Sequence, residues 1–279
     1  MSDTAHQEKH FENYIVSKLA AQGWKVGESS KYDTDKALYP EDLVAWIKAS
    51  DQGDKWAKLE RLNGDKTLDV LMDRLAKALD KNGTMQVLRQ GFSIAGCGLI
   101  ELTESAPEDM RNEDVIKRYQ ANILRVVPQL QYHPSRKLAI DLVFFINGLP
   151  VATVELKTDF TQSAEAAMEQ YRTDRLPFDP VSKRKEPLLT FKRGAVVHFA
   201  MSDSEIMMAT KLDGVNTFFL PFNKGNNGHA GNPIGDLKDD GTREYPVAYF
   251  WEKVCQPEAW LRIFHSFVYV EKKDVADLK

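Results

Sequence analysis

The order of helix-like and strand-like segments predicts an α/β (α+β) fold, in which helices flank a mixed central β-sheet. An amphipathic segment opens the chain, strand-like runs rich in valine, isoleucine and phenylalanine follow in its middle, and a helical segment separates them from further strands. Helices interspersed with strands form layers over a sheet, so this order excludes a helical bundle and a β-sandwich. With 279 residues and 43% hydrophobic content, the chain can bury a sizeable core.

Helices predominate in the first third of the chain. The segment "HFENYIVSKLAAQGW" places Phe11, Ile15 and Leu19 at helical spacing, and Gly23 is a stop signal. A second helical region covers about residues 40–80, in pieces separated by "SDQGDK" and "NGD". Its clearest apolar stripe consists of Leu68, Leu71, Met72, Leu75 and Leu79. We interpret this region as an N-terminal helical elaboration, and whether it belongs to the core or is an insertion stays open.

The later elements are shorter. "GFSIAGCGLIEL" suits a strand, "NEDVIKRYQAN" suits a short helix, and "ILRVVPQLQYH", "KLAIDLVFFI" and "VATVELK" suit three successive strands. A helix is expected to start near Thr161, before strands in "AVVHFAMS" and "EIMMATKL". A glycine- and asparagine-rich connector and an apolar helix close the chain. We therefore divide the chain into a domain at 7–222 and a connector with a linking helix at 223–279.

Composition narrows the class of protein. The start is polar and no apolar run approaches the roughly 20 residues of a membrane helix, so we expect a cytoplasmic protein without a membrane partner. The net charge of −4 excludes a uniformly basic surface but allows a local basic patch. The two distant cysteines match no metal-ligand spacing, and the chain contains no G-x-x-x-x-G-K-[ST] phosphate-binding loop.

The stretch "IDLVFFINGLPVATVELKT" places charged residues inside two apolar runs. Charged side chains are almost never fully buried unless they are paired or bind a metal, so Asp141, Glu155 and Lys157 require compensation. Alternate residues of a strand share a face, which places Glu155 and Lys157 side by side on the second strand. On the first strand, Asp141 shares its face with apolar neighbours.

The turn between these strands decides whether the acids meet. A two-residue Asn-Gly turn would put Asp141 opposite Val154 and the two acids on opposite faces of the hairpin. A three-residue turn at 147–149 would put Asp141 opposite Glu155 or one step away. We predict the three-residue turn, because Pro150 cannot donate a ladder hydrogen bond next to a tight turn.

In that register the Cβ atoms of Asp141 and Glu155 lie roughly 5 Å apart, and two carboxylates that close need a cation between them. Two carboxylates, the backbone carbonyl of Leu156 and water suit Mg²⁺, with Mn²⁺ as its substitute, better than zinc. Lys157 would orient or deprotonate a water and offset charge on a phosphate. The alternative is structural: Glu155 and Lys157 form a surface pair and Asp141 lies at a sheet edge.

The arrangement resembles the PD-(D/E)-x-K nuclease superfamily, and more closely the amino-terminal nuclease region of the R (HsdR) subunit of type I restriction-modification enzymes. The similarity runs from "FENYIVSKLAAQGW" through "DLVFFINGLPVATVELK" to "FLPFNKGNNGHAGNP" and the final apolar helix. It implies a restriction-endonuclease-like core in which Asp141 and Glu155 bind the metal and Lys157 is the third catalytic residue.

Two further residues carry over from the resemblance. Such families often place a glutamate on the first helix near the metal, which here is Glu12. Type I R subunits also carry a Q-x-x-x-Y element on the helix after the catalytic strand, which implies Gln170 as a catalytic residue. That element is altered in this chain, because position 174 is Asp174 and the nearest tyrosine, Tyr171, follows Gln170 directly. The role of Tyr171 is therefore open.

By this resemblance we expect a Mg²⁺-dependent endonuclease domain that hydrolyses DNA phosphodiester bonds. Its partners are double-stranded DNA and the specificity and methyltransferase subunits of a bacterial or archaeal type I complex, which supply sequence specificity. ATP would act only on the helicase-like motor of a longer protein, of which this chain is expected to be a fragment. A local basic cluster is expected to contact the DNA backbone: Arg172, Arg175, Lys183, Arg184, Lys185, Lys192 and Arg193.

Two other functions stay open at this point. A non-catalytic docking module would join the R subunit to the methyltransferase, and a stand-alone nuclease would act on DNA of particular structure. The basic cluster also has a bland interpretation as a solvated loop.

Overall fold

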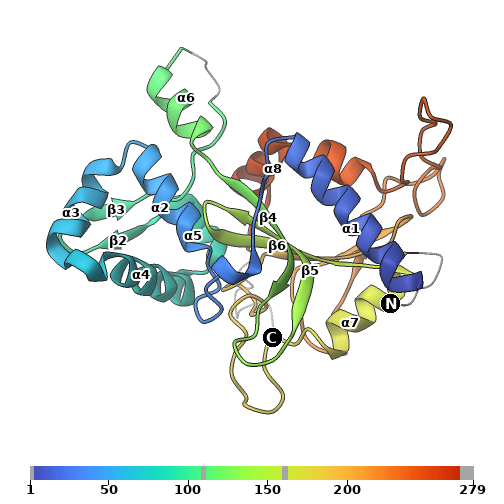
Figure 1. Ribbon diagram of the computed structural model, residues 1–279, viewed down its shortest axis with the longest axis horizontal. Coiled ribbons are helices and arrows are strands. Elements are labelled where there is room, and N and C mark those ends of the chain that lie inside the picture. Colours follow the sequence, from blue (N-terminus) through green and yellow to red (C-terminus); the bar gives the residue numbers. More distant parts are fainter. Residues whose placement is uncertain (1–2, 108–110, 159–162, 271–279) are drawn as a thin grey trace, which may run out of the picture.

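A seven-stranded mixed β-sheet forms the centre of the computed structural model, which describes residues 3–107, 111–158 and 163–270. Its strands are β1 (Lys25–Val26), β4 (Leu124–Gln131), β5 (Ala139–Ile146), β6 (Leu149–Leu156), β7 (Val197–Met201), β8 (Ile206–Ala209) and β9 (Leu220–Pro221). They lie side by side in that order (Figure 1). Strand β1 is parallel to β4 and β6 is parallel to β7, while every other neighbouring pair is antiparallel. The predicted mixed sheet is confirmed.

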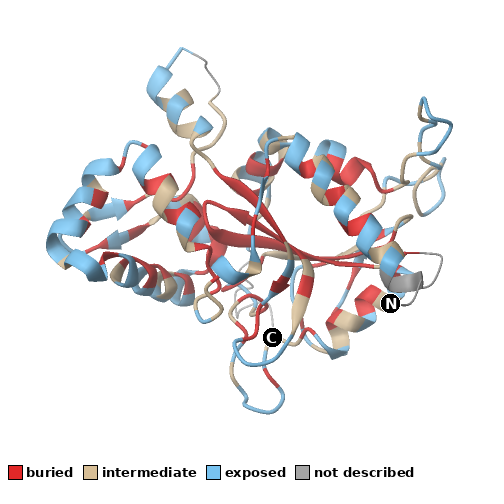
Figure 2. Cartoon of the chain, viewed as in Figure 1, coloured by how far each residue is buried: buried red, intermediate tan, exposed pale blue. Residues whose placement is uncertain are grey.

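Different helices cover the two faces of this sheet (Figure 1). Four segments pack on one face: α1 (Asp3–Ala21), η3 (Phe250–Val254), α8 (Pro257–Arg262) and η4 (Ile263–Phe267). Helix α7 (Ala164–Thr173) packs on the other face. The side chains of β5 alternate between them, since Leu142 and Phe144 join the core that includes α1, and Val143 and Phe145 join the core that includes α7. Figure 2 shows that burial is concentrated in these central strands.

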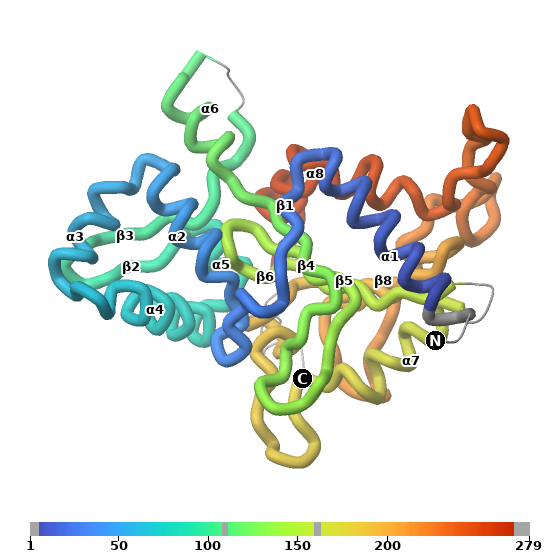
Figure 3. Tube along the Cα trace, viewed as in Figure 1, coloured from blue at the N-terminus to red at the C-terminus, as the bar shows by residue number. Residues whose placement is uncertain are grey.

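A mainly helical layer extends from one side of the sheet (Figures 1 and 3). It contains α2 (Pro40–Ala49), α3 (Gly53–Asn63), α4 (Thr67–Asn82), α5 (Thr84–Gln90) and the hairpin of β2 (Phe92–Ile94) and β3 (Gly98–Ile100), and α6 (Glu113–Gln120) follows it. Leu71, Leu75 and Leu79 of α4 belong to the same continuous hydrophobic core as Phe11 of α1. Leu68, expected on the same stripe, lies in the first turn of α4 and is 39% exposed.

Two other elements differ from the sequence-based expectations. The segment expected to form one strand is the β2–β3 hairpin, because Gly96 and Gly98 adopt positive φ and reverse the chain. Helix α7 begins at Ala164, and the expected start near Thr161 lies outside the described residues. No helix in the described part of the chain is long and apolar enough to span a membrane.

The turn of the β5–β6 hairpin contains two residues, so the predicted three-residue turn is wrong. Asn147 and Gly148 have φ values of 49° and 88°, as expected for an Asn-Gly turn whose twist matches the flanking strands. Pro150 is tolerated because it pairs with Phe145 at the second position from the turn, where a two-residue hairpin requires no N–H from it. The turn is also packed from outside, since the Gly148 carbonyl accepts a hydrogen bond from the backbone N–H of Tyr39.

A β-bulge in β6 restores the register in which the acids meet. Phe145 pairs with Pro150, but Phe144 pairs with Ala152, so that Val151 is an extra residue in β6. Because of this extra residue, every later pair is shifted by one position along β6. Leu142 therefore pairs with Val154, where a regular two-residue hairpin would pair it with Thr153. The next positions along the two strands are the predicted pair of acids. The expected register is therefore present, although the bulge and not the turn produces it.

We predict that Gly148→Ala lowers the free energy of unfolding by about 3 kcal/mol, measured by urea unfolding. A left-handed φ costs a non-glycine residue about 1–2 kcal/mol, and a Cβ at this position would lie 2.6 Å from the carbonyl oxygen of Tyr39, an overlap that costs about 1–3 kcal/mol more. Gly228→Ala is the matched control, because Gly228 also has φ of 88° but no atom within 4 Å of the added Cβ. Equal losses in the two variants would contradict tight packing around the turn.

Candidate active site

Asp141 and Glu155 lie next to each other on β5 and β6, at the end of the hairpin that is far from the turn. The Oδ2 atom of Asp141 accepts a hydrogen bond of 2.7 Å from the backbone N–H of Leu156, which fixes the carboxylate against β6. Asp141 is half-buried and Glu155 is completely buried. The two acids therefore form a site with one inner and one accessible carboxylate.

Glu155 has one oxygen with a partner and one without. Its Oε1 atom accepts a hydrogen bond of 2.5 Å from Nε of Arg175, whereas its buried Oε2 atom has no hydrogen-bond partner. Burial and then the nearby Asp141 carboxylate raise the pKa of Glu155 well above its ordinary value, and Arg175 and Lys157 act in the opposite direction. A buried carboxylate oxygen without a partner is energetically costly, and a cation at that position would compensate it.

Helix α1 brings two acids to the same place. Glu12 is 2% exposed, accepts a hydrogen bond from Gln129 of β4, and forms an ion pair with Lys9. Glu8, one turn earlier, lies 3.6 Å from Nζ of Lys157. The structure thus places the predicted Glu12 beside Asp141, since both acids contact Gln129.

The helix that carries Gln170 packs behind the site through a buried polar cluster. The hydroxyl of Tyr171 and Nδ1 of His198 each lie 2.8 Å from the hydroxyl of Thr153, which is two residues before Glu155 on β6. Tyr171 is fully buried, so its side chain ties α7 to the sheet and is not open to solvent. Gln170 has a buried Oε1 atom without a partner, and its catalytic role stays a prediction.

The basic cluster predicted for DNA divides into two groups. Arg175 is 8% exposed and bonded to Glu155, and Arg193 is 7% exposed and bonded to Asp80, so neither guanidinium is available to a phosphate. This corrects the expectation for both arginines, because a run of basic letters does not reveal burial. Arg172 and Arg184 form ion pairs on the surface. Three lysines are exposed and form no ion pair within the described residues: Lys183, Lys185 and Lys192.

Sequence reasoning missed Gln129, Glu8 and the structural role of Arg175. Gln129 is a polar residue in a strand and Glu8 is a polar residue on a helix. Their spacing in the sequence does not indicate that they lie at the site. Arg175 lies on the loop after α7, and only the fold shows that this loop passes close to Glu155.

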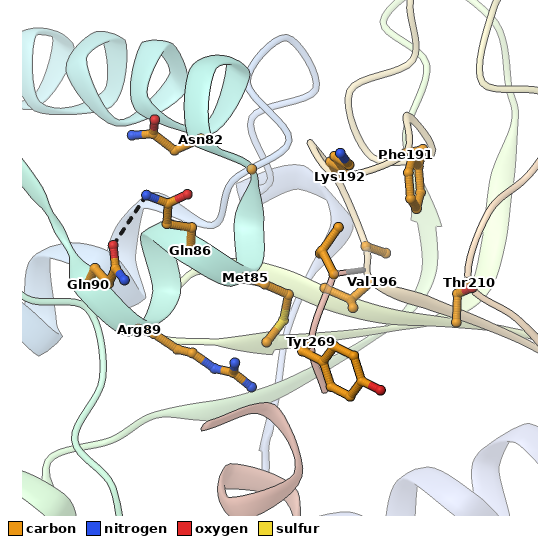
Figure 4. A pocket seen from close by; sticks show the side chains of 13 residues that line it. Asn82, Met85, Gln86, Arg89, Gln90, Phe191, Lys192, Val196, Thr210 and Tyr269 are labelled. Atoms are coloured by element: carbon orange, nitrogen blue, oxygen red, sulfur yellow. Dashed lines mark hydrogen bonds between the residues drawn. The ribbon is translucent and has the colours of Figure 1, made fainter. Parts of the chain in front are cut away.

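An open cavity of about 380 Å³ lies beside the site, lined by Thr158, the residue after Lys157, and by His6, Gln7, His10 and Phe11 of α1, together with Asp203 and Tyr245. A second groove, of about 430 Å³, runs between α5 and the segment around Phe191 (Figure 4). Its lining includes Arg89, Lys192 and Tyr269 but no carboxylate. The first cavity is the one of these two that adjoins Lys157, through its neighbour Thr158.

A second group of metal-ligand side chains contains His133, Asp179 and Glu186, whose ligand atoms lie within 4.8 Å of one another. The Nδ1 atom of His133 accepts hydrogen bonds from the backbone N–H groups of Ser135 and Arg136, so the proton of the neutral ring is on Nε2. That nitrogen, which faces Asp179 at 3.1 Å, has no lone pair for a metal. Arg136 forms an ion pair with Asp179 of this group, whereas both carboxylate oxygens of Glu186 are buried without a hydrogen-bond partner.

Comparison with known families identifies the chain. The family model for the N terminus of the type I restriction enzyme R protein matches residues 6–217. The chain therefore belongs to this family, and the resemblance expected from the sequence is confirmed. No curated protein matches it in a sequence comparison.

We predict that the protein loses about 2 kcal/mol of stability between pH 8 and pH 5 through His198 alone. Burial lowers the pKa of His198 to about 3, whereas an unfolded histidine has a pKa near 6.5. Below pH 6.5 His198 binds a proton in the unfolded chain but stays neutral in the folded chain. The free energy of unfolding therefore decreases as the pH is lowered through this window, and it stops decreasing near pH 3. Urea unfolding at both pH values measures the loss.

The control is His198→Gln, which keeps an acceptor for the Thr153 hydroxyl but does not titrate. All other titrating groups are common to both proteins, so the loss between pH 8 and pH 5 should be about 2 kcal/mol smaller in the variant. The same pH dependence in both proteins would show that His198 is protonated in the folded state.

Proposed function

We propose that this chain is the Mg²⁺-dependent endonuclease domain of a type I restriction enzyme R subunit, which hydrolyses DNA phosphodiester bonds. The observation that carries the proposal is the buried Oε2 atom of Glu155, which has no partner and belongs to a carboxylate adjacent to Asp141. An apolar core would not keep such an atom, whereas a divalent cation would compensate it. In this role the partner subunits supply sequence specificity, and the domain would bind DNA in the cytoplasm.

The donor set fits magnesium or manganese. Glu155 and Asp141 supply carboxylate oxygens, Glu12 is held within reach by Gln129, and the carbonyl of Leu156 is the proposed backbone ligand. All of these proposed ligand atoms are oxygens, and an all-oxygen set is the one that Mg²⁺ and Mn²⁺ prefer. When bound, the ion would lower the pKa of a coordinated water and polarise the phosphate.

The protein's own residues would then position the reactants. Lys157 directly follows β6, the strand that carries Glu155, its Nζ atom lies 3.6 Å from Glu8, and the next residue, Thr158, lines the cavity. There it would orient the attacking water and offset the charge that develops on the phosphate. Arg175 would hold Glu155 through Oε1 and leave Oε2 for the cation.

The partners follow from the family. We propose double-stranded DNA as substrate and the specificity and methyltransferase subunits as partners, with ATP used only by motor domains of a longer chain. The three exposed lysines, Lys183, Lys185 and Lys192, are the best candidates for contacts with the DNA backbone, because no ion pair in the described part of the chain occupies them.

Calorimetric titration with Mn²⁺ tests the metal site. We expect the wild type to bind Mn²⁺, and we expect Asp141→Asn and Glu155→Gln to bind at least about 100-fold more weakly, because each loses a charged ligand. Glu169→Gln is the matched control, since Glu169 is an exposed acid of α7 and should leave binding unchanged. Wild-type binding in all four proteins would place the bound Mn²⁺ away from Asp141 and Glu155.

Lys157→Ala separates metal binding from chemistry. We expect this variant to bind Mn²⁺ like the wild type but to cleave supercoiled plasmid DNA about 10² to 10⁴ times more slowly, the range for loss of a proton-transfer group. Circular dichroism checks that the fold is retained. Full cleavage by Lys157→Ala would assign the lysine to a structural pair with Glu8.

DNA affinity measured at several salt concentrations tests the lysines. Removing one phosphate contact should reduce the slope of log K against log[salt] by about 1, so the combined change of Lys183, Lys185 and Lys192 to alanine should flatten it by about 3. Lys211→Ala is the control, because Lys211 is exposed but paired with Asp213. An unchanged slope in the triple variant would exclude these lysines from the DNA interface.

A further inference from the structure

We propose that Gln129 is a positioning residue, whose side-chain amide holds Glu12 of α1 against Asp141 of β5 and thereby fixes the spacing of the acids around the metal. The inference rests on the proposed metal site and deepens it. Gln129 belongs neither to the D…E-x-K triplet nor to the helix that carries Gln170.

The geometry is that of one donor group shared by two acceptors. The Nε2 atom of Gln129 donates to Oδ1 of Asp141 at 2.9 Å and also to Oε2 of Glu12. An amide nitrogen has two hydrogens, so each carboxylate receives one. Glu12 is 117 residues away in the sequence, and the amide is thus a direct tie between the first helix and the catalytic hairpin.

The backbone is held in an unusual conformation to make this tie. Strands β4 and β5 pair at Pro128 with Leu142 and at Leu130 with Ile140, so Gln129 stands opposite Asp141. Its φ is 48°, and among the described strand residues other than glycine it alone has a positive φ. Glutamine has no intrinsic preference for the left-handed region, and such conformations persist where surrounding contacts impose them, most often at functional sites.

The chemistry of the amide suits a metal site better than a charged donor would. A lysine or arginine between Glu12 and Asp141 would neutralise the charge that attracts a cation. The neutral amide orients both carboxylates without adding a positive charge and leaves their remaining lone pairs available. Donors of this kind, which hold the ligands of a metal, contribute strongly to its affinity.

The test compares Mn²⁺ binding by titration calorimetry in the wild type and two variants of the same chain. Gln129→Gly removes the amide while glycine accepts the positive φ, so the fold should be retained. Gln129→Glu replaces the donor by a third carboxylate, which cannot bridge the other two. Gln131→Ala is the matched control, because Gln131 is an exposed glutamine two residues along β4 that pairs with Ala139 and not with an acid.

For Gln129→Gly we expect a loss of about 10- to 100-fold in Mn²⁺ affinity, with circular dichroism unchanged and with Gln131→Ala equal to the wild type. For Gln129→Glu we expect a lower melting temperature without metal and a larger rise on adding Mn²⁺ than in the wild type, because the cation relieves repulsion among three carboxylates. A merely structural residue would lower the melting temperature equally with and without Mn²⁺.

The failures can be told apart. If the wild type binds Mn²⁺, Asp141→Asn does not, and Gln129→Gly binds like the wild type, then the positioning role is overturned and the metal site stands. If the wild type itself binds no Mn²⁺, the proposed metal site fails and the role of Gln129 fails with it.

Discussion

The buried carboxylate of Glu155 is the constraint on which the arrangement of the site depends. Burying an ion costs several kcal/mol even after the protein relaxes around it, and a single ion pair does not always offset that cost. Arg175 reaches from the loop after α7 to one oxygen, and the other oxygen stays without a partner. The loop, the helix before it and the strand that carries Glu155 are therefore arranged around one charge. Removing Arg175 would leave an uncompensated buried carboxylate, which explains why this arginine is inside the protein.

The same charge explains why the hairpin needs a bulge. At one end, the two-residue Asn147-Gly148 turn packs closely against the backbone of Tyr39, which leaves no room for a larger turn. At the other end, Asp141 and Glu155 have to share a face. A regular two-residue hairpin cannot satisfy both, because its register sends the acids to opposite faces. The extra residue Val151 satisfies both ends by changing the register between them, a use of bulges that is common near active sites.

Much of the fold followed from local patterns, and the rest depended on contacts that local patterns do not contain. The strands and the first helix have a strong hydrophobic periodicity in the sequence, and these elements are present in the structure. The residues of the D…E-x-K triplet are visible in the sequence as charges inside apolar runs. The Asn-Gly pair is the stronger signal for the turn, because Pro150 needs no N–H in the actual pairing and so does not oppose a two-residue turn. The burial of Arg175 and Arg193 is not visible in the sequence, because chain segments distant in sequence produce it. Gln129 could not be found, since a left-handed glutamine has no sequence signature.

If the proposed metal site is occupied, the charges around it match one divalent cation better than two. Four carboxylates gather here, from Glu8, Glu12, Asp141 and Glu155, and three cationic side chains contact them, from Lys9, Lys157 and Arg175. With the acids ionised, one negative charge is left over, and a single divalent ion turns it into one positive charge. A phosphodiester carries one negative charge, so the proposed substrate and one divalent cation would together bring the partly buried site to neutrality, which a low-dielectric environment favours. A second divalent ion would leave an excess of positive charge that no described side chain in contact with these acids offsets.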